Sequence, residues 1–296
     1  MIYSVEDART AASITPALPP AVSHYRRPGL FYLLALGIPW LTWGVAGYLS
    51  RRPDQTTTTQ VATAALGLLG LVAPIGVAAS LIGRDRVLRA DVRRRLVGLR
   101  GIRPGLAALA VVLLPASLLV ATGLSVLAGY PAGQFGLRGG ASFTAGLLPA
   151  WLLLVGAAVV EELAWHSYGT DALASRWTVW RTTCVFAVFW FLWHVPLSFI
   201  KGYYQAEVVE IGPLASVNFV VSVLPFMILM NWLYYRCGRS ILVAIVFHVS
   251  ANVGNELFLT HPDTKVIQTG LLLIVSAVVL WRERRLFFTR PLRQDR

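Results

Sequence analysis

The sequence predicts an all-α protein that spans a membrane as a polytopic bundle of about eight helices. Of the 296 residues, 56% are hydrophobic and only 14% are charged, whereas about a quarter of the residues in a soluble domain are charged. In addition, apolar stretches of about 20 residues recur along the chain, and each is long enough to cross a hydrocarbon core of about 30 Å. No polar stretch is long enough to predict a second, soluble domain.

The chain begins with a polar, proline-rich segment, residues 1–28, which we predict to be a cytoplasmic tail. It does not resemble a signal peptide, because the first apolar run begins too late and is too long. The transmembrane domain is predicted to cover residues 29–281, and a basic cytoplasmic tail, 282–296, follows it. The seventh span is the least regular, because three polar side chains interrupt it. In order, the predicted spans are 29–49, 61–83, 106–128, 146–166, 182–200, 213–235, 241–259 and 267–281.

Positive charges are unevenly divided between the two sides that these spans define. With the N-terminus inside, 21 of the 26 Lys and Arg residues lie in inside segments and 5 lie in outside segments. Because inside loops are enriched in Lys and Arg, we predict that both termini are cytoplasmic. We also expect the membrane to be a plasma membrane of bacterial type. The basic loop 84–103 is explained first by topology and second by contact with anionic lipid. We therefore predict membrane lipid, and no nucleic acid, as a partner.

Six acidic or histidine side chains lie within the predicted spans or at their edges. A charge at the centre of a bilayer costs at least about 2.5–3.5 kcal/mol, so such groups usually face the interior of a bundle and meet partners there. Because these residues come from three different spans, we expect them to line one polar cavity, except that Glu256 is expected to emerge at the outer surface. The six are Glu161, Glu162, His166, His194, His248 and Glu256.

Helical spacing groups these side chains further. Residues four apart share one face of a helix, whereas neighbouring residues point about 100° apart, so Glu161 and Glu162 face different directions. The pairs that are four apart are Glu162 with His166, Trp190 with His194, and His248 with Asn252.

Two kinds of hydrolytic chemistry fit this set. In the first, Glu161 is the general base that takes a proton from a water, and His194 holds the same water. His248 and Asn252 then donate hydrogen bonds to the oxyanion. In the second, Glu161, His194 and His248 ligate a divalent metal such as zinc. The residues fit both schemes, so the cofactor is either one zinc ion or none.

Three short motifs, in this order, resemble those of the CPBP family, which contains CAAX proteases and bacteriocin-processing enzymes. The family's Glu-Glu-x-x-x-Arg corresponds to residues 161–166, its Phe-x-x-x-His to 190–194, and its His-x-x-x-Asn to 248–252. The resemblance covers roughly residues 145–260. Two positions depart from the family pattern, since His166 replaces the Arg and Trp190 replaces the Phe.

The resemblance implies an intramembrane endopeptidase that hydrolyses a peptide bond in a membrane-associated or prenylated protein or peptide. An Arg is always charged and forks to carboxylates, whereas a His titrates near neutrality. His166 therefore leaves open a catalytically impaired protein that acts as a scaffold or a bacteriocin-immunity protein. A proton-coupled transporter is a weaker alternative, since no internal repeat is apparent. The implied catalytic residues are Glu161, Glu162, His194, His248 and Asn252, with His166 and Trp190 as accessory residues.

Overall fold

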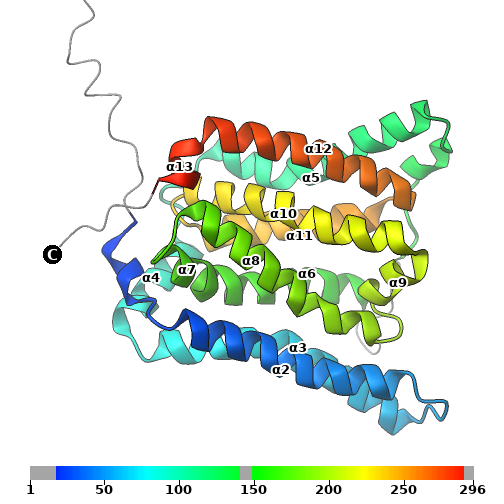
Figure 1. Cartoon of the computed structure of the whole chain (residues 1–296), viewed down its shortest axis with the longest axis horizontal. Coiled ribbons are helices and arrows are strands. Elements are labelled where there is room, and N and C mark those ends of the chain that lie inside the picture. The colour runs from blue at the N-terminus through cyan, green and yellow to red at the C-terminus, as the bar shows by residue number, and fades with distance from the viewer. Residues whose placement is uncertain (1–17, 141–148, 290–296) are drawn as a thin grey trace, which may run out of the picture.

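The computed structural model describes residues 18–140 and 149–289. Within these ranges the chain is helical, apart from turns and one isolated β-bridge between Leu137 and Phe258. Figure 1 shows the long helices lying side by side as a bundle. The predicted tails lie partly outside the described ranges, at 1–17 and 290–296, and the described part of the C-terminal tail contains a short helix, Arg284–Phe288.

Seven helical segments in the described chain are long and apolar enough to cross a membrane, which confirms the predicted polytopic bundle of an integral membrane protein. An eighth apolar helix, α11 (Ile241–Leu257), has 17 residues. At a rise of 1.5 Å per residue it is about 25 Å long, close to the hydrocarbon thickness. The seven segments are Pro28–Ser50 (α2), Thr57–Gly83 (α3), Pro104–Leu127 (α5), Ala150–Ala174 (α6 to α7), Val179–Phe199 (α8 and a 3-10 turn), Pro213–Arg236 (α10) and Pro262–Arg282 (α12).

Two of the predicted spans differ clearly from the observed helices. The last helix begins at Pro262 rather than 267, because the ring nitrogen Nδ1 of His261 accepts the N–H of Asp263 (3.2 Å) and caps the helix there. Proline also suits the first turn, where no backbone N–H is needed. The fourth span continues to Ala174 rather than 166, and its predicted start at 146 lies outside the described residues.

The fourth span continues because α6 (Ala150–Ala164) passes through a π turn, Trp165–Gly169, into α7 (Thr170–Ala174). The N–H of Thr170 bonds to the carbonyl of Trp165, five residues back. A π turn inserts an extra residue into a helix and is frequent at functional sites. Here it follows directly after the predicted glutamate pair, so it changes the direction in which every later residue of the span points.

The first hairpin packs through glycine. The indole N–H of Trp43 on α2 donates to the carbonyl of Gly67 on α3 (2.9 Å). A Cβ at Gly70 would lie 2.2 Å from the same indole nitrogen, so only glycine fits there. Trp43 also contacts Trp193 on α8 edge-on, with ring centroids 4.7 Å apart. The hairpin is thereby held against the helix that carries the second sequence motif.

The two ends of the bundle differ in structure. One end, here called the α4 end, carries the turn Pro20–His24 and the short helices α4 (Arg86–Val97) and α13 (Arg284–Phe288). The other, here called the α9 end, carries the loop 51–56 and α9 (Tyr204–Ile211). Eight helices are an even number of crossings, so both ends of the described chain lie at the α4 end (Figure 1).

Candidate active site

A cavity of about 1130 Å³ enters the bundle from the α9 end. Arg51, Arg52 and Lys201 line its outer part, between α2, α3 and the segment before α9. Residues from all three sequence motifs line its inner part, which brings α6, α8 and α11 together as predicted. The predicted site residues in its wall are Glu161, Trp190, His194, His248 and Asn252.

Glu161 presents its carboxylate to this cavity while the residue itself is buried. The indole Nε1–H of Trp190 donates to its Oε2 at 3.0 Å. The second oxygen makes no hydrogen bond to any residue that the structure describes, so it is the one available to a water in the cavity. Trp190 therefore orients the carboxylate through an indole N–H, a donor that the Phe of the family pattern lacks.

His194 is held by a backbone carbonyl of its own helix. Its Nδ1 lies 2.7 Å from the carbonyl oxygen of Trp190. A carbonyl can only accept, so Nδ1 carries the proton and Nε2 of the neutral ring presents a lone pair. Pro196 lacks an N–H, so one carbonyl of the preceding helical turn is left without its helical donor. That carbonyl, of Leu192, instead accepts the indole N–H of Trp40 (2.9 Å), which leaves His194 free for the cavity.

His248 is held in the same way from another helix. Its Nδ1 lies 2.7 Å from Oε1 of Glu162, and its ring stands edge-on to Trp190 and Phe226. Because Nδ1 faces a carboxylate, Nε2 is the nitrogen left to act in the cavity. It presents a lone pair when the ring is neutral and an N–H when the ring is charged.

Glu162 lies behind the cavity wall rather than in it. The residue is fully buried, and both carboxylate oxygens are occupied, one by His248 and the other by Nδ1 of His166. The other ring nitrogen of His166, Nε2, lies 3.2 Å from Oδ1 of Asn231, whose Nδ2 donates to Thr183. In this arrangement both nitrogens of His166 face oxygen acceptors, which a doubly protonated ring would satisfy with two N–H donors. The pairing of His166 with Glu162 is the one that their four-residue spacing predicted.

Asn252 ties α11 to α6 as well as lining the cavity. Its Nδ2 donates to the backbone carbonyl of Leu154 at 3.1 Å. One of the two amide N–H groups is thus used for positioning, and the second remains for a ligand.

Comparison with known proteins agrees with this geometry. A family model described as Type II CAAX prenyl endopeptidase Rce1-like matches residues 143–254, a range that contains all three motifs. The protein named CAAX prenyl protease 2 from Methanococcus maripaludis is 33% identical over 272 residues, which are 91% of this chain and 99% of that relative. The chain belongs to this family. It is an intramembrane endopeptidase, as predicted, and the comparisons do not favour the immunity-protein or transporter alternatives.

For this Rce1-like endopeptidase, the second predicted scheme needs three metal ligands that meet at one point. Glu161, His194 and His248 line the same cavity. Yet no three His, Cys, Asp or Glu side chains gather closely enough to hold an ion anywhere in residues 18–140 and 149–289. The donors in this conformation do not fit a zinc site, so we derive no step through a metal.

The structure also corrects one expectation about the site and adds a group of residues that the sequence did not reveal. Glu256, expected at the outer surface, is buried and lines the cavity. Arg95 and Arg239, counted in the sequence only as topology signals, are buried and pair with Asp91 and Asp171. The one available signal was the four-residue spacing of Asp91 and Arg95 within the basic loop.

Proposed function

We propose that Glu161 activates a water for attack on a peptide carbonyl in a membrane-associated protein or peptide. The observation that supports this role is that the two adjacent glutamates differ in their hydrogen bonds. Glu161 has an oxygen open to the cavity, whereas both oxygens of Glu162 are occupied by histidines. Only a carboxylate with an accessible lone pair can take a proton from a water.

In this mechanism the water donates one proton to Glu161 and its oxygen attacks the carbonyl carbon. The lone pair on Nε2 of His194 accepts the second O–H of the water and so fixes its direction. The negative charge on the carbonyl oxygen meets the free N–H of Asn252 and Nε2–H of a charged His248, whose charge the carboxylate of Glu162 stabilises. Glu161 then returns its proton to the leaving amine as the C–N bond breaks.

The substrate class follows from the family and from the cavity. Prenylation appears in the family description and in the name of the relative, which we extend to this chain as a proposal. The cavity suits a lipidated segment, because much of its wall is apolar and the basic side chains Arg51, Arg52 and Lys201 line its outer part. Its apolar lining includes Leu68, Leu71, Leu153, Leu154, Leu197 and Phe219.

We test this function with purified protein in detergent and a fluorogenic peptide that carries a prenylated cysteine near its C-terminus. The parent should cleave, and Glu161→Gln should not, because an amide cannot accept the proton. Glu210→Gln is the matched control, since Glu210 is an exposed carboxylate at the rim of the same cavity. Cleavage by Glu161→Gln at the parental rate would contradict the proposal.

We also propose that both termini are cytoplasmic, which puts the α9 end and the cavity mouth on the opposite side. The unequal division of positive charge supports this orientation. In a cysteine-free background, Gln55→Cys at the α9 end should react with a membrane-impermeant maleimide in intact cells. Leu99→Cys, exposed near the α4 end, should react only after permeabilisation. The reverse labelling pattern would invert the orientation and place the mouth in the cytoplasm.

A further inference from the structure

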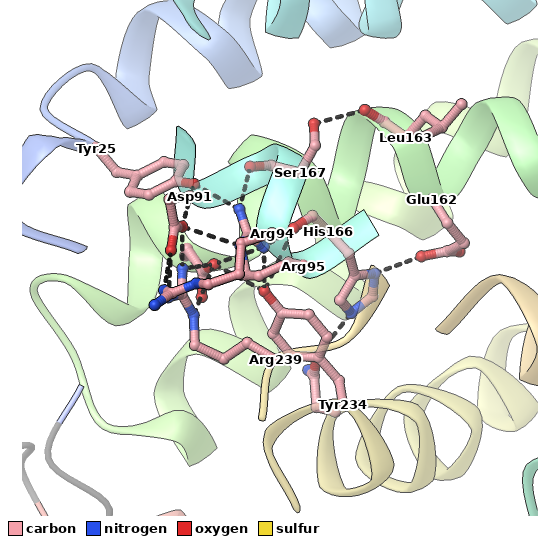
Figure 2. A network of polar contacts seen from close by, with 12 residues as sticks. Tyr25, Asp91, Arg94, Arg95, Glu162, Leu163, His166, Ser167, Tyr234 and Arg239 are labelled. Carbon is pink, nitrogen blue, oxygen red and sulfur yellow. Dashed lines mark hydrogen bonds and ion pairs between the residues drawn. The ribbon is translucent and has the colours of Figure 1, made fainter. Parts of the chain in front are cut away.

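Four buried charges form a cluster, whose contacts Figure 2 shows in part; two of the four lie on α4, so the cluster belongs to the α4 end of the bundle. Each of these side chains is at most 4% exposed. Arg95 lies 2.9 Å from Asp91 and 3.1 Å from Asp171, and Arg239 lies 2.9 Å from Asp91 and also pairs with Asp171. Two positive and two negative charges balance, so the cluster is neutral as a whole. Such a group needs no ligand for its own stability.

The two arginines of this cluster differ in the partners that they bond besides the aspartates. Arg239 bonds only to the two aspartates among the described residues. Arg95 in addition forks across two successive carbonyls of the π turn, with Nη1 donating to the oxygen of His166 (2.8 Å) and Nη2 to that of Ser167 (2.9 Å). A planar guanidinium fits such a fork, whereas the single ammonium of a lysine does not.

The π turn connects this fork to the catalytic cavity. Tyr234 adds a second link between Arg95 and His166. Its hydroxyl accepts from Arg95 (2.6 Å), and its ring packs edge-on against the ring of His166, with centroids 4.7 Å apart. The His166 ring bonds to Glu162, and Glu162 bonds to Nδ1 of His248, whose other nitrogen serves the cavity. A continuous chain of contacts therefore runs from Arg95 to His248.

We propose that Arg95 is a positioning residue for the active site: by holding the carbonyls of His166 and Ser167, it fixes the π turn that aims His166 at Glu162 and thereby orients His248. The proposal rests on the proposed function for its activity readout. Among the described residues, none of the hydrogen-bond or ion-pair partners of Arg95 lines the cavity, so an effect of Arg95 on the reaction passes through this chain of contacts.

The test compares Arg95→Lys with Arg239→Lys. Each substitution keeps the positive charge at its own position, but only Arg95→Lys removes the two hydrogen bonds to the carbonyls of the π turn. We expect Arg95→Lys to lower kcat by about 10–100-fold with KM within about twofold, the scale seen when a partner that orients a functional histidine is lost. Arg239→Lys should lower the unfolding temperature comparably and leave kcat within about threefold of the parent. Equal losses of kcat in both variants would reduce the cluster to a structural role and overturn the proposal.

A spectroscopic readout keeps the test independent of cleavage. The ¹⁵N signals of the His248 ring, in protein labelled at histidine, report whether Glu162 still holds Nδ1. Arg95→Lys should shift them and Arg239→Lys should not; unchanged signals in Arg95→Lys would overturn the proposal. If Arg95→Lys does not fold, Tyr234→Phe takes its place, because it removes the hydroxyl that accepts from Arg95. It should shift the same ¹⁵N signals, and unchanged signals would overturn the proposal. If the parent protein cleaves no peptide, the proposed function is refuted, but the ¹⁵N measurement still tests whether Arg95 positions His248.

Discussion

Replacing each of the two adjacent glutamates by glutamine should separate a catalytic role from a positioning role. Glu162 accepts from His166 and from His248 with its two oxygens, and it is fully buried. Glutamine has a single acceptor oxygen, so in Glu162→Gln one histidine N–H faces an amide N–H. A buried donor left without a partner costs about 1–3 kcal/mol of stability. The variant should therefore unfold at a lower temperature than the parent.

The effects on activity should be ordered differently from those on stability. Glu162→Gln leaves the general base in place and loosens His248, so kcat should fall by about 10–100-fold with little change in KM. Glu161→Gln keeps an oxygen for the indole N–H of Trp190 and should unfold as the parent does. Its kcat should fall by at least about a hundredfold, the lower range for loss of general-base catalysis.

The assay measures initial rates on the prenylated fluorogenic peptide in detergent, together with the unfolding midpoint from intrinsic tryptophan fluorescence. The reasoning is refuted if Glu162→Gln abolishes cleavage without loss of stability while Glu161→Gln retains it. That result would make Glu162 the base and would require its two histidine contacts to open during the reaction.

Three further predictions concern charge and metal. Burial alone would raise the pKa of the Asp91 carboxyl, but the guanidinium groups of Arg239 and Arg95 outweigh it and hold the pKa at about 2. Since this lies below the usual value of about 3.9, the ionised Asp91 carboxyl contributes about 2–3 kcal/mol of stability above pH 4, which is lost as pH falls from about 4 to 2. Acid unfolding followed by fluorescence should show this loss, and Asp91→Asn should lack it. If His166 supplies the positive charge that organises Glu162, His166→Arg should retain cleavage where it folds, because an arginine keeps that charge; loss of cleavage in a folded His166→Arg variant would speak against the idea. Finally, cleavage should persist after stringent chelation, and its loss with recovery on adding zinc would restore the metal scheme.

The sequence alone determined the membrane architecture and the pairings within each helix. Uninterrupted apolar runs have few alternatives to crossing a bilayer as helices, because every backbone group must be satisfied internally. Spacing of four residues fixes a shared helix face, so the pairing of Glu162 with His166 was predictable. The three motifs in order were sufficient to indicate the family before any fold was known.

Only the tertiary structure decided which glutamate meets the cavity and what lies behind it. The 100° between Glu161 and Glu162 shows that the two differ but not which faces inward, because that depends on how α6 is rotated against α8 and α11. The burial of Arg95 was equally hidden. A basic run beside a span has the same sequence whether its arginines are solvated or buried. The difference lies in two aspartates, Asp91 and Asp171, which are 80 residues apart and share their arginine partners only in the folded chain.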